Sequence, residues 1–173
     1  MQKERKVILA FIGSLWIAMP LYLFLHEGGH ALIAILCGAK IVDFNLMQGY
    51  VIAEGGTFND VTLALFNVAG VLVPAATLLI YLILYKRNTR ELFYQLFSVL
   101  FTGIIIFSMG VWIVVPILYM LGRANPIDDV VKFIEVLNIH PIFVTLGASI
   151  VTSLYIMYVW KKGVLQNCYK VVH

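Results

Sequence analysis

The sequence predicts an all-α membrane protein, a bundle of about four to five transmembrane helices with a small re-entrant β-hairpin-like segment. Of the 173 residues, 62% are hydrophobic and only 12% are charged, against about 25% charged in typical soluble domains. The apolar residues come in runs long enough to cross a bilayer, which takes about 20 helical residues. Between the first two runs, a polar stretch instead alternates in the period-2 pattern of a strand.

The first apolar run covers residues 7–37. As a single helix it would be about 46 Å long, longer than the hydrocarbon core of about 30 Å. The helix must therefore tilt, kink or project from the membrane, and Pro20 is a natural kink site because it lacks a backbone N–H. The basic start resembles a signal peptide, but no small-residue cleavage pattern follows, so we expect a retained anchor.

A hairpin-like segment is expected over residues 39–58. Gly38 ends the first helix, and residues 41–47 then alternate between apolar and mostly polar side chains. Gln48-Gly49 supplies turn residues, and residues 50–53 make a returning strand before two further glycines interrupt it.

The rest of the chain predicts three more spans and one short amphipathic helix. The third apolar run is interrupted by Gly110 and Pro116, so it is either one kinked helix or a span plus a half-helix. The apolar positions of residues 129–137 share one helical face. We interpret residues 1–173 as a single integral membrane core, with a polar loop at 122–130. The four expected long helices cover about 7–37, 61–85, 92–121 and 141–160.

The basic residues predict the orientation. They flank the apolar runs in short clusters, whereas a nucleic-acid-binding protein carries a basic stripe along one face. Four spans put nine basic residues on one side and three on the other. By the positive-inside rule both termini are cytoplasmic, and without a targeting signal we expect the plasma membrane. The side with nine carries Lys3, Arg5, Lys6, Lys86, Arg87, Arg90, Lys161, Lys162 and Lys170.

A His-Glu-x-x-His motif lies inside the first apolar run, at residues 26–30. Histidines four residues apart project from one helical face, so His26 and His30 can bind one zinc ion. Glu27 between them can act as the general base that takes a proton from the attacking water. The alternative is a polar cluster that only helps helices pack. However, each ionisable residue in a span costs about 2.5–3.5 kcal/mol, which favours a metal site.

The two glycines of this motif, Gly28 and Gly29, each weaken a helix by about 1 kcal/mol relative to alanine. Their lack of a side chain lets a neighbouring helix or an extended substrate approach the metal. Simple helix packing is an equally good interpretation.

The motif, followed by Gly38 and the hairpin-like segment, resembles the site-2 protease family of intramembrane zinc metalloproteases. The resemblance implies a third metal ligand, an aspartate from a later Asn-Pro motif. Residues 125–129 read Asn-Pro-Ile-Asp-Asp, so the ligand is Asp128 or Asp129, with Asp129 preferred. Residues 67–74 are a loose version of another family motif, and the absence of a PDZ domain suggests a minimal core.

The predicted function is therefore a zinc-dependent endopeptidase with one zinc ion, which cleaves within or next to a transmembrane segment of a membrane-protein substrate. Phe44 lies in a strand that can pair with the unwound substrate, or the strand is only a lid. Asn67 orients substrate or water, or packs helices. The alternatives are a metal or proton transporter and an inactive relative that binds membrane segments. The substrate and the oligomeric state stay open.

Overall fold

The computed structural model describes residues 2–172, which form six helices and a two-stranded antiparallel sheet. Within that range four helices are long and apolar enough to cross a membrane, namely α1, α2, α3 and α5. The predicted fold class is therefore confirmed. The elements are α1 (Gln2–Leu36), β1 (Ala39–Asn45), β2 (Tyr50–Gly55), α2 (Asp60–Leu84), α3 (Leu92–Met120), α4 (Asp129–Leu137), α5 (Pro141–Lys162) and α6 (Val164–Val172).

The three long helices with an internal proline are continuous. Pro20 lies inside α1, a helix of 35 residues, Pro74 lies inside α2 and Pro116 lies inside α3. The third apolar run is therefore one helix rather than a span plus a half-helix. One element was not predicted: α6 follows Lys162, beyond the expected end of the last helix at about residue 160. Gly163, with a φ of 74°, separates α5 from α6.

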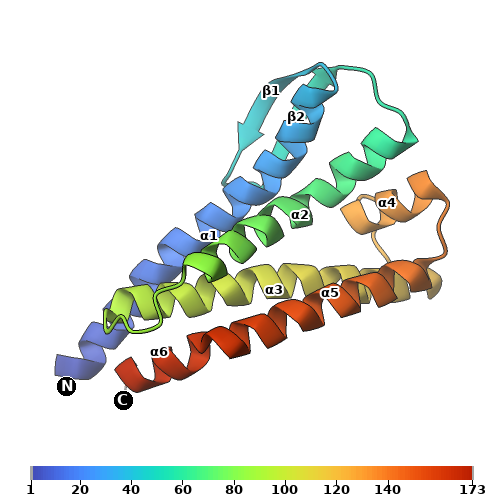
Figure 1. Ribbon diagram of the computed structural model, residues 1–173. Helices are drawn as coiled ribbons and strands as arrows, with labels where there is room; N and C mark the ends of the chain where they lie inside the picture. Colours follow the sequence, from blue (N-terminus) through green and yellow to red (C-terminus); the bar gives the residue numbers. More distant parts are fainter. Residues whose placement is uncertain (1, 173) are drawn as a thin grey trace.

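The helices place two groups of short elements at opposite ends of the bundle (Figure 1). The β-hairpin and α4 lie at one end, which we call the hairpin end. The two termini, α6 and the connection between α2 and α3 lie at the other, which we call the terminal end. Helix α1 packs against α2 and α3, and α4 packs against α2 and α3. This arrangement brings α4 to the C-terminal half of α1.

The crossing of α1 and α2 depends on two glycines. A Cβ on Gly29 of α1 would collide with the backbone carbonyl of Ala69 in α2. A Cβ on Gly70 would lie 2.5 Å from His30 Nε2 and 2.6 Å from His26 Cε1. By contrast, Gly28 has no heavy atom within 4 Å of its Cβ position. Of the two alternatives for the motif glycines, Gly29 therefore serves close helix packing, whereas the Cβ position of Gly28 is open.

Candidate metal centre

Two helices supply the side chains of the site. His26, Glu27 and His30 lie on α1, and their spacing places the two imidazoles on one face. Asp129 is the first residue of α4. Asp128, immediately before it, caps the helix, since its Oδ1 accepts a hydrogen bond from Val130 N at 2.8 Å. The carboxylate of Asp128 is thus engaged with its own helix, while that of Asp129 reaches α1.

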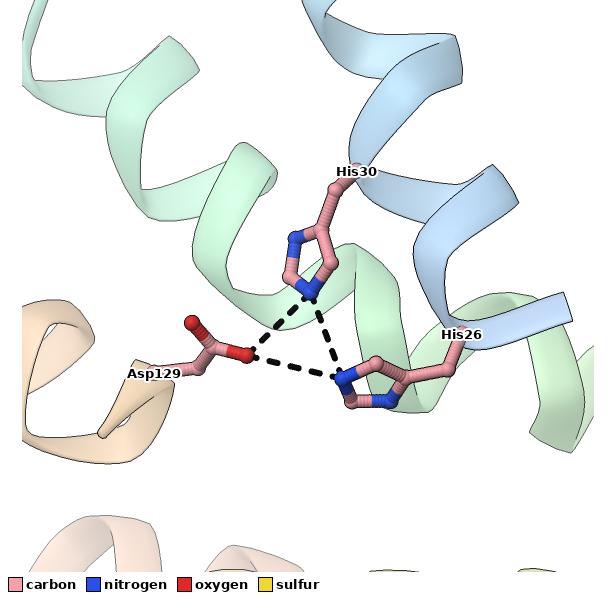
Figure 2. Close-up of side chains that lie close together, drawn as sticks. All are labelled: His26, His30 and Asp129. Carbon is pink, nitrogen blue, oxygen red and sulfur yellow. Dashed lines mark hydrogen bonds and ion pairs between the residues drawn. The ribbon is translucent and has the colours of Figure 1, made fainter. Parts of the chain in front are cut away.

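Three predicted ligands converge on one point (Figure 2). His26 Nε2 and His30 Nε2 lie 3.4 Å apart, and Asp129 Oδ2 lies 3.1 Å from His30 Nε2 and 3.7 Å from His26 Nε2. Ligands about 2.0–2.2 Å from a tetrahedral zinc ion lie about 3.4 Å apart. The described residues offer this one group of three or more His, Cys, Asp or Glu ligands. Its chemistry fits a zinc ion with a fourth position left open.

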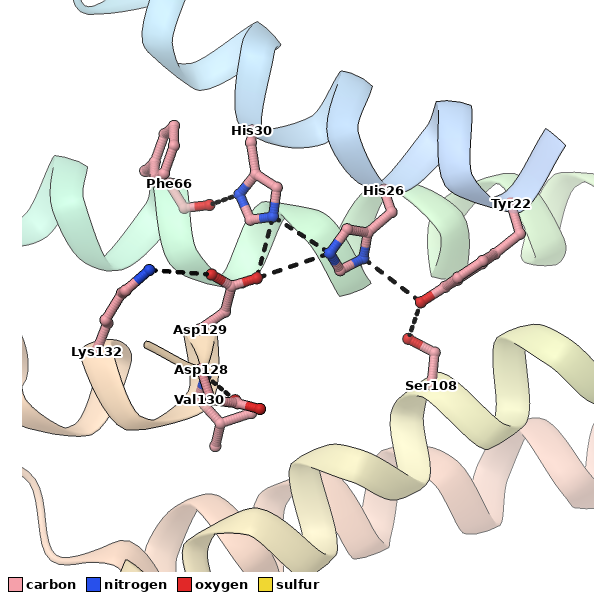
Figure 3. Close-up of polar contacts among 9 residues, drawn as sticks. All are labelled: Tyr22, His26, His30, Phe66, Ser108, Asp128, Asp129, Val130 and Lys132. Atoms are coloured by element: carbon pink, nitrogen blue, oxygen red, sulfur yellow. Dashed lines mark hydrogen bonds and ion pairs between the residues drawn. The ribbon is translucent and has the colours of Figure 1, made fainter. Parts of the chain in front are cut away.

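The Nδ1 atom of each imidazole faces a hydrogen-bond partner, on the side of the ring away from the metal point (Figure 3). His30 Nδ1 lies 2.7 Å from the carbonyl oxygen of Phe66 and donates to it. Tyr22 Oη lies 3.5 Å from His26 Nδ1 and donates a hydrogen bond of 2.8 Å to Ser108 Oγ on α3. Such partners fix the ring orientation and leave Nε2 free for a metal.

A cleft of 490 Å³ opens beside the three ligands. Glu27 lines it and is 6% exposed. The turn of the hairpin covers this carboxylate, because the Cβ position of Gly49 lies 3.9 Å from Glu27 Oε1. Gly49, Tyr50 and Val51 line the cleft from the hairpin, and Trp112 lines it from α3. The cleft is therefore bounded by the metal ligands, the expected base and the first residues of β2.

Electrostatics keep the carboxylate of Asp129 charged. Burial of this side chain favours the neutral form, but hydrogen bonds and charge interactions with His26 and His30 outweigh burial. Together they hold the pKa of Asp129 well below its ordinary value. Lys132 Nζ, 4.0 Å from Asp129 Oδ1, lies on the same helix. Asp129 is thus an anionic candidate ligand at ordinary pH.

The two predicted substrate-binding residues lie outside this cleft lining. Asn67 is 5% exposed within α2, and Phe44 packs against Phe24 with ring centroids 6.0 Å apart. Neither belongs to the cleft-lining residues of the described chain, so both roles stay predictions.

Sequence reasoning missed four contributors to the site. Tyr22 precedes His26 by four residues, so it shares a helical face, and this spacing was a usable signal. Ser108, Phe66 and Gly70 come from other helices. Nothing in the local sequence indicates that they meet the motif.

One comparison with known proteins identifies a family. A family model described as Peptidase M50B-like matches residues 7–164, a range that includes every residue of the cleft. The match is consistent with the resemblance to the site-2 protease family. No curated protein and no solved structure matches the chain.

Proposed function

The chain belongs to the Peptidase M50B-like family, and on that premise we propose that it is a zinc-dependent intramembrane endopeptidase. Its substrate is a membrane protein, cut within or next to a transmembrane segment. The convergence of His26, His30 and Asp129 beside the buried Glu27 carries this proposal. The proposed location is the plasma membrane, and the charge bias of the segments flanking the helices favours cytoplasmic termini.

The metal would be held by His26, His30 and Asp129. When bound, zinc polarises the scissile carbonyl and makes a nearby water more acidic. Glu27 takes the proton of the attacking water and delivers it to the leaving amine. Phe66 and Tyr22 hold the imidazoles in position through Nδ1. Removing Glu27 would therefore stop proton transfer without removing a metal ligand.

The position of the motif supports cleavage at the membrane. His26 and His30 belong to α1, one of the four helices apolar enough to span. A helical substrate buries its carbonyls in intrahelical hydrogen bonds, so it must unwind locally before the cut.

The hairpin is the expected partner of the unwound segment. In a two-stranded sheet each strand keeps one edge without a strand neighbour, and such an edge can pair with an extended peptide. Residues 41–47 were expected to provide this edge. The cleft is lined by Tyr50 and Val51, which favours β2 as the pairing strand.

The test compares the native chain with Glu27→Gln. Both proteins, purified in detergent, are expected to carry about one zinc ion per chain. In cells expressing native protein, membrane-protein fragments with new termini in or beside a transmembrane segment should accumulate. These fragments should be lost with Glu27→Gln.

Two outcomes would contradict the proposal. Equal fragment production by Glu27→Gln would remove the base assignment. Zinc in both proteins, with no fragments from either, would indicate the inactive relative.

A further inference from the structure

A second polar pocket lies at the terminal end, the end of the bundle opposite the hairpin end with its metal ligands (Figure 1). Its cavity of 710 Å³ lies between the α2–α3 connection and α6. Among the residues that the structure describes, no acidic side chain lines it. Its polar lining consists of Arg87, Asn88, Thr89, Arg90, Asn167 and Lys170.

A buried chain of hydrogen bonds holds the two walls together. Tyr85 Oη donates to Gln95 Oε1 at 2.6 Å, and Gln95 Nε2 donates to the carbonyl oxygen of Thr89 at 2.8 Å. Asn167 Nδ2 of α6 donates to Tyr85 Oη at 3.2 Å. Gln95 is 0% exposed and Asn167 is 8% exposed. The loop is therefore tied to α6, and the pocket is a built feature.

The Arg87 side chain packs against the turn between α5 and α6. The Cβ position of Gly163 lies 3.4 Å from Arg87 Nε, so the guanidinium lies over the turn between α5 and α6. The positive φ of this glycine makes the turn possible. No ion pair occupies Arg87, Arg90 or Lys170 among the residues described. Within residues 2–172, the pocket thus presents three cations without a carboxylate counter-ion.

The charge of the pocket and its level in the membrane indicate the kind of ligand it binds. The terminal end carries nine of the 12 basic residues and, with Glu4 and Glu91, only two of the nine acidic ones. The pocket lies where α2 ends and α3 begins, which is headgroup level for spanning helices. Helix α6 leaves Leu165 and Tyr169 half or more exposed, as in a helix that lies in the membrane interface.

We propose that this pocket binds the phosphate headgroup of an anionic phospholipid. Arginine forks match phosphate oxygens with paired hydrogen bonds, and the lysine adds a point charge. The exposed apolar residues of α6 would contact the acyl region beside it. This site is independent of the proposed catalysis, since none of its residues lines the metal cleft.

The experiment measures lipid retained by the purified full chain, using phosphatidylglycerol and phosphatidylcholine in mixed micelles and native mass spectrometry. The native chain is expected to retain phosphatidylglycerol preferentially. The triple variant Arg87→Gln/Arg90→Gln/Lys170→Gln should weaken this binding roughly a hundredfold, from about fivefold per cation at a membrane surface.

The matched control removes three exposed cations from the same end but outside the pocket, with Arg5→Gln/Lys6→Gln/Lys161→Gln. It should change binding much less than the pocket variant. Should the triple variant fail to fold, Arg90→Gln alone is expected to lose about fivefold.

Three results would overturn the proposal. The first is equal loss in the pocket and control variants, which indicates diffuse surface charge. The second is equal retention of phosphatidylcholine. The third is binding of inorganic phosphate as tight as that of the lipid, which would replace the lipid by a free anion.

Discussion

The hairpin end and the terminal end of this bundle both bury polar groups, but they satisfy them in opposite ways. At the hairpin end, His26, His30 and Asp129 direct ligand atoms at one common point beside an open cleft. At the terminal end, Tyr85, Gln95 and Asn167 bond to one another. Convergence on a cleft indicates chemistry, whereas mutual bonding indicates a structural joint. The difference separates a candidate active site from a scaffold within one small protein.

The acidic and basic residues are also distributed unequally between the two ends. Seven of the nine acidic residues lie in or near the hairpin end, and nine of the 12 basic residues lie in or near the terminal end. The seven are Glu27, Asp43, Glu54, Asp60, Asp128, Asp129 and Glu135. The negative end attracts cations and the positive end attracts anions, because fields of many charges add over a surface. This division of charge supports the proposals of a metal ion at the hairpin end and an anionic lipid at the terminal end.

The largest expected effect comes from removing the third ligand. Asp129→Ala should lose zinc affinity by more than about 100-fold, a larger loss than is typical when only a hydrogen-bond partner of a ligand is removed, and should abolish cleavage. Asp128→Ala removes a helix cap instead, at about 1 kcal/mol of stability, and should keep its zinc. Metal analysis of both purified variants measures this. If Asp128→Ala loses zinc and Asp129→Ala keeps it, the ligand set at the hairpin end is wrong.

The two motif glycines give the next effect. Gly29→Ala forces a methyl group against the carbonyl of Ala69, so α1 and α2 must separate at a cost of about 1–3 kcal/mol. Gly28→Ala meets open space and should stabilise the helix slightly. Thermal unfolding and the zinc affinity of Gly29→Ala and Gly28→Ala measure the two effects. Similar behaviour of the two variants would mean that the helix crossing does not depend on Gly29.

How far the sequence alone reaches depends on whether a signal is local. The long apolar runs and the alternation near Phe44 are local, and they predicted four spanning helices and a hairpin. The motif placed His26 and His30 on one face for the same reason. The packing of Gly29 on Ala69 and of Gly70 under the imidazoles joins two helices, and no local pattern encodes it.

Two further points needed three-dimensional structure. Asp128 and Asp129 are adjacent, so sequence left both open as ligands; the helix-capping bond of Asp128 distinguishes them physically. Helix α6 lies beyond the last expected helix. In the fold it packs against α3, and its buried Asn167 donates a hydrogen bond to Tyr85 Oη.

A smaller effect at the hairpin end is expected from Tyr22→Phe. The variant loses the hydroxyl between His26 and Ser108. Zinc affinity should therefore fall about 10-fold, the low end of the loss seen when a hydrogen-bond partner of a metal ligand is removed. The stability of the metal-free protein should hardly change. Tyr155→Phe is the matched control, since its hydroxyl donates to the carbonyl oxygen of Ala75 and neither residue lines the cleft. Chelator competition measures the zinc affinity of both variants. If Tyr22→Phe binds zinc as tightly as Tyr155→Phe, Tyr22 is not a positioning residue.

The smallest effect on the metal comes from Gln95→Ala at the terminal end. This change removes the acceptor of Tyr85 and the donor to Thr89, so stability should fall by about 1–3 kcal/mol, the cost of buried polar groups left without partners. Zinc affinity should stay within about twofold, because the network shares no residue with the cleft. Thermal unfolding and chelator competition on one sample separate the two quantities. A parallel loss of zinc would mean that the two ends are coupled through the long helices, and the division between active site and scaffold would fail.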